Sequence, residues 1–467
     1  MELNIQENEA INKVAEIAQK TGIESYVIGG FVRDLALKKA SKDIDFVCRG
    51  SGIALAEAVG KSIGSKVTVY RKFGTAMLMY KDHQLEFVGA RKESYRSESR
   101  KPIVEDGTIE DDQKRRDFTI NAMAININKE NFGQLTDPFN GIADLKKKQV
   151  RTPLPPDITF SEDPLRMMRA IRFASQLNFD IDPDTFQAIK NNKGRMEIVS
   201  QERTTDELNK IILSEKPSYG FKLLFHSGLL HEVFPRLVAL HGVEKREGLS
   251  HKDNFYHTLQ VLDNISGVTN DLWLRWAALL HDIAKPDTKR FVKGHGWTFH
   301  GHEDKGARLV PGIFRGLKLP LGKQMHYVQK LVRLHLRPIA LVKEEITDSA
   351  VRRLLYEAGD NIEDLMKLCK ADITSKIDVK VKKYLTNFAK VEKKMREVEE
   401  NDRVRNFQPP VTGEEIMAHF NLSPCKLVGE IKDEIKEAIM EGKIGNNQEE
   451  ATQLMWEIGK RKGLARP

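Results

Sequence analysis

Apolar residues recur at two different spacings in the first 90 residues. Ile11, Val14 and Ile17 stand three apart, and this helical spacing predicts a helix over residues 10–20. Short apolar runs typical of strands follow it, at 26–28, 43–48, 66–70, 75–80 and 84–88. Such an alternation predicts an N-terminal α+β domain, which we place at residues 1–150.

The pattern changes twice further along the chain. Residues 93–116 are polar and have no apolar period, so we expect a mobile loop there. After "RTPLPPD" at 151–157, strand-like runs nearly disappear and the pattern becomes helical. The sequence therefore predicts an all-α neck over 151–240, followed by further helical domains.

Histidine marks one of these domains. Eleven of the 13 histidines lie between His226 and His335, which indicates a separate unit at 241–375. Beyond it, an apolar stripe at helical spacing runs along a Lys-rich segment that ends before Pro409. We take this segment as the start of a helical C-terminal domain, 376–467. The stripe consists of Tyr384, Phe388, Val391, Met395 and Val398.

Composition narrows the class of protein. A chain of 467 residues is too long for one core, so two to four domains are expected. No stretch is apolar enough for a membrane helix, and the start lacks the pattern of a secretory signal. The three scattered cysteines fit a reducing compartment, and we expect a cytoplasmic protein. The net charge of +8 is compatible with a polyanionic partner but is weak evidence alone.

The stretch "YVIGGFVRDLALKKASKDIDFV" combines groups that suit a phosphate and a metal. Gly29 and Gly30 allow close approach of the backbone to a phosphate, and Arg33 beside Asp34 supplies a forked cation. On a strand, residues two apart project to the same face, so Asp43 and Asp45 would present paired carboxylates. Oxygen ligands of this kind favour Mg²⁺ held jointly with substrate phosphates. The alternative is that the glycines form only a tight turn, that Asp43 caps a helix or turn, and that Asp45 lies on a solvated edge.

Together with later segments, this stretch resembles the class II tRNA nucleotidyltransferase and bacterial poly(A) polymerase family. The resemblance covers about the first 215 residues, and its motifs stand in the family's order. Besides "GGFVRD" with "KDIDFV", they are "RRDFTINAMA" at 115–124, "DPFNGIADLKKKQVRTP" at 137–153, "EDPLRMMRAIRFASQLNF" at 162–179 and "ERTTDELNKII" at 202–212. The resemblance implies a DNA polymerase beta-like fold for the first domain.

The resemblance also implies roles for individual residues. Asp43 and Asp45 would hold the catalytic Mg²⁺ ions, with Glu86 as our candidate for a third carboxylate, unless Glu86 is simply an edge-strand charge. By the same resemblance, Arg116, Asp117 and Asn121 would contact the sugar and phosphates of the nucleotide. The alternative is that these residues form an ion-pair network on the surface.

The segment "EDPLR" is where the family reads the incoming base without a template. Asp163 and Arg166 stand three apart at a predicted helix start, where together they can imitate the pairing edge of a base. Arg169 and Arg172 continue the stripe as cations for phosphates or RNA. The alternative is a helix-capping aspartate with a solvated arginine face.

The histidine-rich region resembles an HD-type metal phosphohydrolase. Its segments are "NFYHTLQVLDNI" at 254–265, "WAALLHDIAKP" at 276–286 and "KLCKADI" at 367–373. The resemblance implies a divalent transition metal site, with His302 and His335 available to extend it. Such a domain either hydrolyses phosphoesters or serves as a scaffold. The implied ligands are His257, His281, Asp282 and Asp372.

From these resemblances we expect an enzyme that adds CCA to tRNA 3′ ends, with CTP and ATP as donors. An A-adding enzyme or a poly(A) polymerase would share the same motifs. A phosphohydrolase with a nucleotide-binding domain, or a tRNA-binding protein without activity, remain alternatives of another class. The Lys-rich C-terminal helices would contact RNA phosphates, or else present a solvated lysine face. The oligomeric state is not predicted.

Overall fold

The computed structural model describes residues 4–96, 99–343, 347–374, 378–402 and 409–464. The chain forms two compact units, Met1–Val238 and Ala239–Pro467. This division lies beside the expected boundary at 240. None of the described helices is long and apolar enough to cross a membrane.

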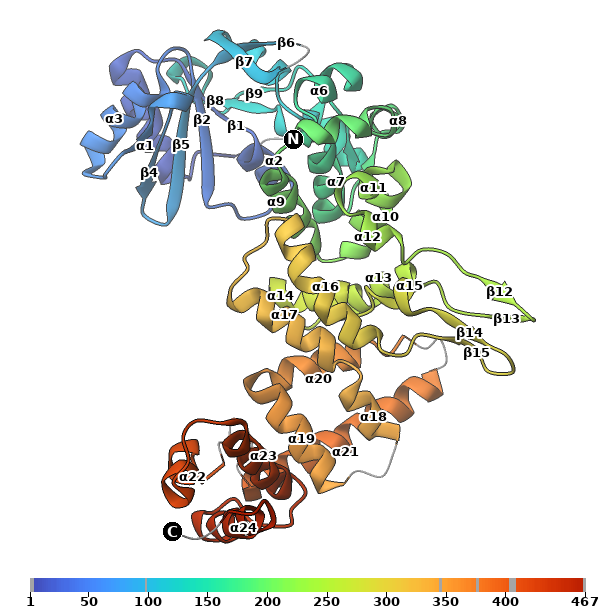
Figure 1. Cartoon of the computed structure of the whole chain (residues 1–467). Coiled ribbons are helices and arrows are strands. Elements are labelled where there is room, and N and C mark those ends of the chain that lie inside the picture. The colour runs from blue at the N-terminus through green and yellow to red at the C-terminus, as the bar shows by residue number, and fades with distance from the viewer. Residues whose placement is uncertain (1–3, 97–98, 344–346, 375–377, 403–408, 465–467) are drawn as a thin grey trace. The chain divides into compact units, whose positions relative to one another are not determined.

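A mixed seven-stranded sheet forms the centre of the first unit (Figure 1). Its strands follow the order β3-β4-β5-β2-β1-β8-β9, and β2 pairs with β5 in parallel while the other pairs are antiparallel. The strands are β1 (Ser25–Ile28), β2 (Asp43–Cys48), β3 (Thr68–Tyr70), β4 (Thr75–Tyr80), β5 (His83–Gly89), β8 (Ala124–Asn126) and β9 (Leu135–Thr136).

The early apolar pattern forms the elements that it predicted. Helix α1 (Glu9–Thr21) buries Ile11, Val14 and Ile17, and Asn8 caps its start. Helix α3 (Gly52–Ile63) packs on α1 and lies across β4 and β5. The five strand predictions are confirmed by β1, β2, β3, β4 and β5.

The prediction of a loop over 93–116 is wrong. Strands β6 (Arg91–Arg96) and β7 (Ser99–Asp106) form a separate antiparallel hairpin, and residues 97–98 lie outside the described part. Helix α4 (Ile109–Lys114) follows, with Thr108 and Asp111 in a capping box. The hairpin is not part of the main sheet, and its sequence shows no apolar alternation that would predict strands. The capping box, however, is readable as Thr-x-x-Asp in the sequence.

Helices continue the first unit after residue 150, with the two-residue strands β10 (Gln149–Val150) and β11 (Asp180–Ile181) pairing in parallel. Helix α7 packs against α9 and α10, and it buries Met167, Met168 and Ile171. The remaining helices are α2 (Gly30–Ala36), α5 (Gly141–Lys147), α6 (Pro156–Glu162), α7 (Leu165–Leu177), α8 (Pro183–Asn192), α9 (Gln201–Ile212), α10 (Pro217–Ser227), α11 (Leu229–Val233) and α12 (Pro235–Val238).

The second unit is almost entirely helical, as expected, with two short hairpins that the sequence pattern did not indicate. These are β12 (Lys245–Arg246) with β13 (Leu249–Ser250), and β14 (Arg290–Val292) with β15 (Gly296–Thr298). The helices are α13 (Asn254–Ser266), α14 (Leu272–Leu280), α15 (Lys285–Thr288), α16 (His302–Gly316), α17 (Lys323–Leu334), α18 (Arg337–Lys343), α19 (Asp348–Ala358), α20 (Ile362–Ala371), α21 (Asp378–Asp402), α22 (Gly413–Phe420), α23 (Lys426–Met440) and α24 (Gln448–Arg461). Short 3₁₀ turns complete both units: η1 (Arg71–Phe73), η2 (Thr119–Asn121), η3 (Lys129–Asn131), η4 (Lys193–Ile198) and η5 (Gly359–Asn361).

The Lys-rich helix predicted around 376–400 is α21, and residues 375–377 just before it lie outside the described part. It packs against α18 and α19, and it buries four members of the predicted stripe. Tyr384, the fifth member, is 36% exposed. The buried four are Phe388, Val391, Met395 and Val398.

Candidate functional site

Two neighbouring parallel strands carry the predicted acids. Asp43 and Asp45 project from the same face of β2, and Glu86 on β5 stands in register with Asp45. Burial raises the pKa of Asp45, and the nearby charge of Asp43 adds to this, while Arg116 opposes it. Burial also raises the pKa of Glu86, and the charge of Asp45 adds to that. Carboxylates that repel one another in this way fit a site for a divalent cation.

The carboxylates of Asp43, Asp45 and Glu86 do not form a compact group of ligand atoms. Among the described residues, they are not in a group whose ligand atoms all lie within 4.8 Å of one another. Their placement on adjacent strands gives the oxygen donors that Mg²⁺ prefers.

The turn between β1 and α2 lies against these acids because Ile28, the last residue of β1, pairs with Asp45. Gly29 follows with φ of 83°, in the region that favours glycine. A methyl group on Gly29 would lie 2.8 Å from Arg116 Nη1 and 3.4 Å from Asp45 Oδ2. Gly30 then begins α2. The turn therefore brings bare backbone, a guanidinium and a carboxylate together.

A polar network joins the other predicted residues of this unit. Arg33 donates to Asp34 Oδ1 and to Asn121 Oδ1, both at 2.8 Å. Asn121 donates to Asp117 Oδ1 at 3.1 Å, and Arg169 pairs with Asp117 Oδ2 at 2.5 Å. Burial alone would raise the pKa of Asp117, but Arg169 and Asn121 outweigh it and bring the pKa down to about 2. The structure thus brings together residues from three separate sequence motifs.

Phe173 stands at the centre of three arginines, and sequence reasoning did not single it out. The Cζ atoms of Arg172, Arg33 and Arg169 lie 3.9, 5.2 and 5.6 Å from its ring centroid. Each cation has its own carboxylate partner, and that of Arg172 is Glu207, at 2.6 Å. Glu207 lies in "ERTTDELNKII" and is only 3% exposed. The sequence did offer a signal for Phe173, since it is an aromatic residue that directly follows a series of arginines three residues apart.

Asp163 and Arg166 lie at the start of α7 as expected, but both already have protein partners. Asp163 Oδ2 accepts from Arg203 Nη2 at 3.0 Å, and its Oδ1 accepts from the backbone N–H of Leu165 at 3.2 Å. Arg166 is 9% exposed and pairs with Glu162 at 3.1 Å. Arg166 also donates to the carbonyl of Arg115 at 2.6 Å. A ligand that bound these side chains would have to replace or share these partners.

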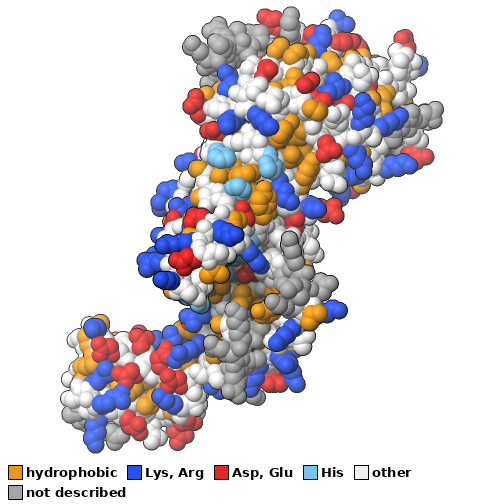
Figure 2. Space-filling view, turned by 90° about the vertical axis from the view of Figure 1, so that its right-hand side faces the viewer, with side chains coloured by type: hydrophobic (Ala, Val, Ile, Leu, Met, Phe, Trp, Pro, Cys, Tyr) orange, Lys and Arg blue, Asp and Glu red, His pale blue; other side chains and the backbone are white. Residues whose placement is uncertain are grey.

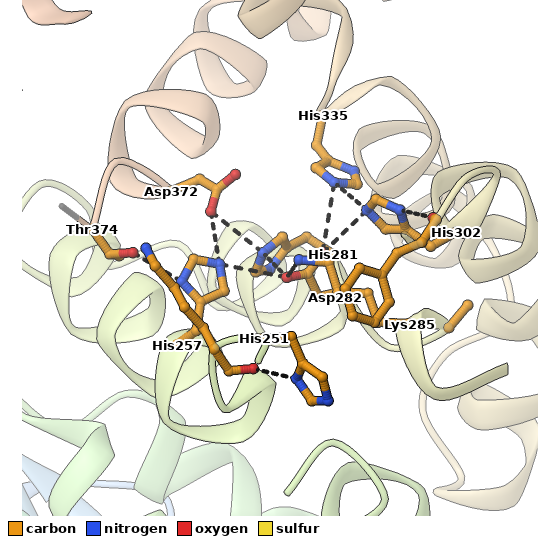
Figure 3. A network of polar contacts seen from close by, with 12 residues as sticks. His251, His257, His281, Asp282, Lys285, His302, His335, Asp372 and Thr374 are labelled. Carbon is orange, nitrogen blue, oxygen red and sulfur yellow. Dashed lines mark hydrogen bonds and ion pairs between the residues drawn. The ribbon is translucent and has the colours of Figure 1, made fainter. Parts of the chain in front are cut away.

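The second unit contains a cluster of histidines and aspartates (Figure 3). The ligand atoms of His257, His281 and Asp372 lie within 4.8 Å of one another, and those of Asp282, His302 and His335 do so as well. Asp282 joins the two groups. Its Oδ2 lies 3.1 Å from His281 Nε2, and its Oδ1 lies 3.2 Å from His302 Nε2.

Four histidines direct their Nε2 atoms toward the centre of this cluster. Nδ1 contacts an oxygen acceptor in each case, at 2.9 Å for Thr374 Oγ1 with His257 and at 2.7 Å for a backbone carbonyl with His281, His302 and His335. This leaves every Nε2 facing the centre, which is the usual orientation of histidine ligands. His302 Nε2 and His335 Nε2 are only 3.3 Å apart. His281 Nε2 and Asp282 Oδ2 are both buried.

The charges in this cluster also suit a cation. Burial lowers the pKa of His335 to about 3, so this ring is neutral and able to donate a lone pair. Burial would also lower the pKa of His257, but hydrogen bonds to Asp282 and Asp372 raise it to about 9. Lys285 lies 2.6 Å from Asp282 Oδ2. Nitrogen and oxygen donors in two adjoining groups fit one or two transition metal ions.

Comparisons with known proteins agree with this geometry. Residues 25–151 match the poly A polymerase head domain, residues 178–240 match the probable RNA and SrmB-binding site of polymerase A, and residues 254–374 match the HD domain. The predicted fold, a nucleotidyltransferase head followed by a helical neck and an HD domain, is confirmed.

Curated relatives of two kinds are similar to this chain. An A-adding tRNA nucleotidyltransferase of Deinococcus radiodurans is 33% identical over 73% of this chain and 77% of its own length. A multifunctional CCA protein of Nitrosococcus oceani is 31% identical over 75% of this chain and 84% of its own length. The chain spans 45% and 36% of two longer A-adding relatives, from Aquifex aeolicus and Geobacter sulfurreducens.

A solved structure extends the comparison. A tRNA nucleotidyltransferase complexed with a primer tRNA and an incoming ATP analog matches with a TM-score of 0.58 and 26% identity, over 81% of this chain and 99% of that one. With the strand acids, the arginine network and the HD cluster in place, this chain belongs to the tRNA nucleotidyltransferase family, as a member with an HD domain.

Proposed function

We propose that the protein adds CCA to tRNA 3′ ends, using CTP and ATP and releasing pyrophosphate. The observation that carries this proposal is the register of Asp43 and Asp45 on β2 with Glu86 on β5, with the Arg116 guanidinium near Asp45. CCA addition is supported by the multifunctional CCA protein among its relatives. The related structure with a primer tRNA and an ATP analog supports both substrate classes.

The chain's own groups would act mainly by positioning and charge. Mg²⁺ bound by Asp43, Asp45 and Glu86 would supply charge neutralisation and activation of the terminal ribose hydroxyl. Gly29 and Gly30 admit the triphosphate to the backbone, while Arg33, Arg116 and Arg169 present cations to it. Asn121 and Asp117 would contact the sugar of the nucleotide. Phosphoryl transfer needs little more from a protein than such placement.

Asp163 and Arg166 would select the base of the incoming nucleotide. In this structure Arg203 holds Asp163, and the Arg115 carbonyl holds Arg166. An incoming base would replace these partners with its own pairing edge.

Three RNAs separate the possible transfer activities. The purified protein is incubated with labelled CTP or ATP and tRNA lacking its last three residues, tRNA ending in CC, or an unrelated RNA. Addition of C, C and A to the first tRNA supports the proposal. Addition of A only to tRNA ending in CC overturns CCA addition in favour of an A-adding enzyme, and long A tracts on any RNA overturn it in favour of a poly(A) polymerase.

An A-adding enzyme is the second candidate for the head. The relatives from Deinococcus radiodurans, Aquifex aeolicus and Geobacter sulfurreducens all bear this name. The acids and arginines described above serve both activities equally, so the choice depends on the substrate assay.

The HD cluster supports a second activity, hydrolysis of phosphoesters at a transition metal site. The inward-facing Nε2 atoms of four histidines and the two carboxylates of Asp282 and Asp372 carry this proposal. The test combines a metal count by mass spectrometry on protein purified without chelator with assays on 2′,3′-cyclic phosphate substrates. Absence of both metal and hydrolysis would leave the domain a scaffold.

The C-terminal helices are proposed to contact tRNA phosphates through lysines. Figure 2 shows Lys and Arg side chains distributed over the whole visible face among acidic ones, so charge alone does not mark a path for RNA. Phosphate contacts predict that the logarithm of tRNA affinity falls steeply with the logarithm of salt concentration. Replacing Lys383 and Lys390 on α21 by Gln should reduce that slope, and an unchanged slope would exclude them.

A further inference from the structure

Asp112 is a fully buried carboxylate beside the transfer site, with 0% of its surface exposed. It lies on α4, and it belongs to none of the sugar, phosphate or metal contacts described above. Its Oδ1 accepts hydrogen bonds from Arg115 Nε at 2.9 Å and Nη2 at 2.5 Å. Its Oδ2 accepts from Arg116 Nε at 3.1 Å. One carboxylate thus holds two consecutive arginines by different oxygens.

Arg116 extends from Asp112 to the metal-binding strand. Its Nε is bound to Asp112, whereas its Nη1 reaches Gly29, where an added methyl group would lie 2.8 Å from it. The same methyl position lies 3.4 Å from Asp45 Oδ2. A guanidinium is planar and rigid, so fixing its Nε edge also fixes where Nη1 points. Asp112 therefore determines how this cation meets the glycine turn and Asp45.

Asp112 also lies close to the residue proposed to read the base. The backbone carbonyl of Arg115 accepts a hydrogen bond from Arg166 Nη2 at 2.6 Å. Asp112 holds the side chain of Arg115 within the end of α4, the same end whose Arg115 carbonyl is bound by Arg166 of α7. A lone buried ion pair is weak evidence for a stabilising role, because the cost of desolvation offsets much of the attraction. Its connection to Arg116 offers a functional reason for the pair.

We propose that Asp112 is a positioning residue for nucleotide transfer, holding the Arg116 guanidinium between the Gly29 turn and Asp45 so that it meets the triphosphate in a fixed orientation. The inference rests on the proposed transfer function of the head. Asp112 itself touches neither substrate nor metal, and it acts through Arg116.

The test is a double-mutant cycle on the full chain with Asp112→Asn and Arg116→Gln. An asparagine offers one acceptor oxygen, and its amide group would meet Arg116 Nε as donor against donor. Asp112→Asn is expected to lower kcat/KM for the nucleotide about 100-fold, mostly through KM for the nucleotide, with KM for tRNA unchanged. In the Arg116→Gln background the same change should cost less than about threefold, because effects that pass through one side chain are not additive.

Arg115→Gln is the matched control, since it disrupts the same buried cluster from its other side while leaving Arg116 on Asp112. It should raise KM for the nucleotide far less than Asp112→Asn does. Equal effects of the two variants, or full additivity in the cycle, would make the cluster merely structural and overturn the inference. If Asp112→Asn does not fold by circular dichroism, Asp112→Glu carries the same test, because it keeps the charge but shifts the carboxylate. Asp45→Ala serves as the reference: if it retained transfer, the proposed function itself would fail, independently of Asp112.

Discussion

Asp45 is the less exposed aspartate of β2, and it faces Glu86 across a parallel strand pair. Replacing it with Asn keeps the shape but removes the charge that a metal and a triphosphate would require. We expect loss of nucleotide transfer by about 10³-fold or more, since metal stabilisation of the reacting charges contributes several kcal/mol. Hydrolysis at the HD cluster should be unaffected. Incorporation of labelled ATP, measured beside hydrolysis of a cyclic phosphate, checks both outcomes.

Asp117 provides a pH prediction for stability. Its pKa in the folded chain is about 2, below the ordinary value of 3.8, because the pairing with Arg169 outweighs burial. The pair therefore stabilises the fold above pH about 4, and this contribution is lost as the pH falls toward 2. We expect Asp117→Asn to cost about 2 kcal/mol at pH 7 and progressively less below pH 4. Urea unfolding of both proteins at several pH values measures this, and a difference independent of pH would contradict it.

At the scale of elements, the β1–α2 turn decides how closely a phosphate can approach the strand acids. Gly29→Ala introduces a Cβ at positive φ and against Arg116. We expect kcat/KM for the nucleotide to fall by about tenfold or more, because a small displacement at the reacting groups is costly. Gly22→Ala is the matched control, since Gly22 also has positive φ, at 67°, but nothing lies within 4 Å of the added methyl group. Its effect should be confined to a modest loss of stability.

At the scale of the whole molecule, the two compact units suggest separate responses to metal. A transition metal bound by the HD cluster would stabilise the unit that contains it through mass action. Adding a transition metal to chelator-treated protein should therefore raise the unfolding temperature of one calorimetric transition only. His281→Ala should abolish this increase. A shift of both transitions, or a shift that persists in His281→Ala, would contradict a metal site limited to the second unit.

The sequence was sufficient for the features that arise from local pattern. Apolar spacing indicated α1 and the strands β1 to β5, because a helix or strand with one buried face imposes its own period on the chain. The glycine pair, the paired aspartates and the histidine-aspartate segments identified both candidate sites, since their chemistry requires particular residue types at short spacing. The hairpin of β6 and β7 lacked such a period and was taken for a loop.

Contacts between distant residues were decided only by the tertiary structure. The register of β2 with β5 places Glu86 beside Asp45, and the fold brings Arg33 of α2 to the ring of Phe173, which already has Arg169 and Arg172 as neighbours on α7. Asp112 had no signal in the sequence, since it lies in the polar segment 93–116 that was expected to be a loop, where nothing indicated that this aspartate is buried. The positions of these groups depend on chain segments that meet in space, whereas local spacing reports only on neighbours along the chain.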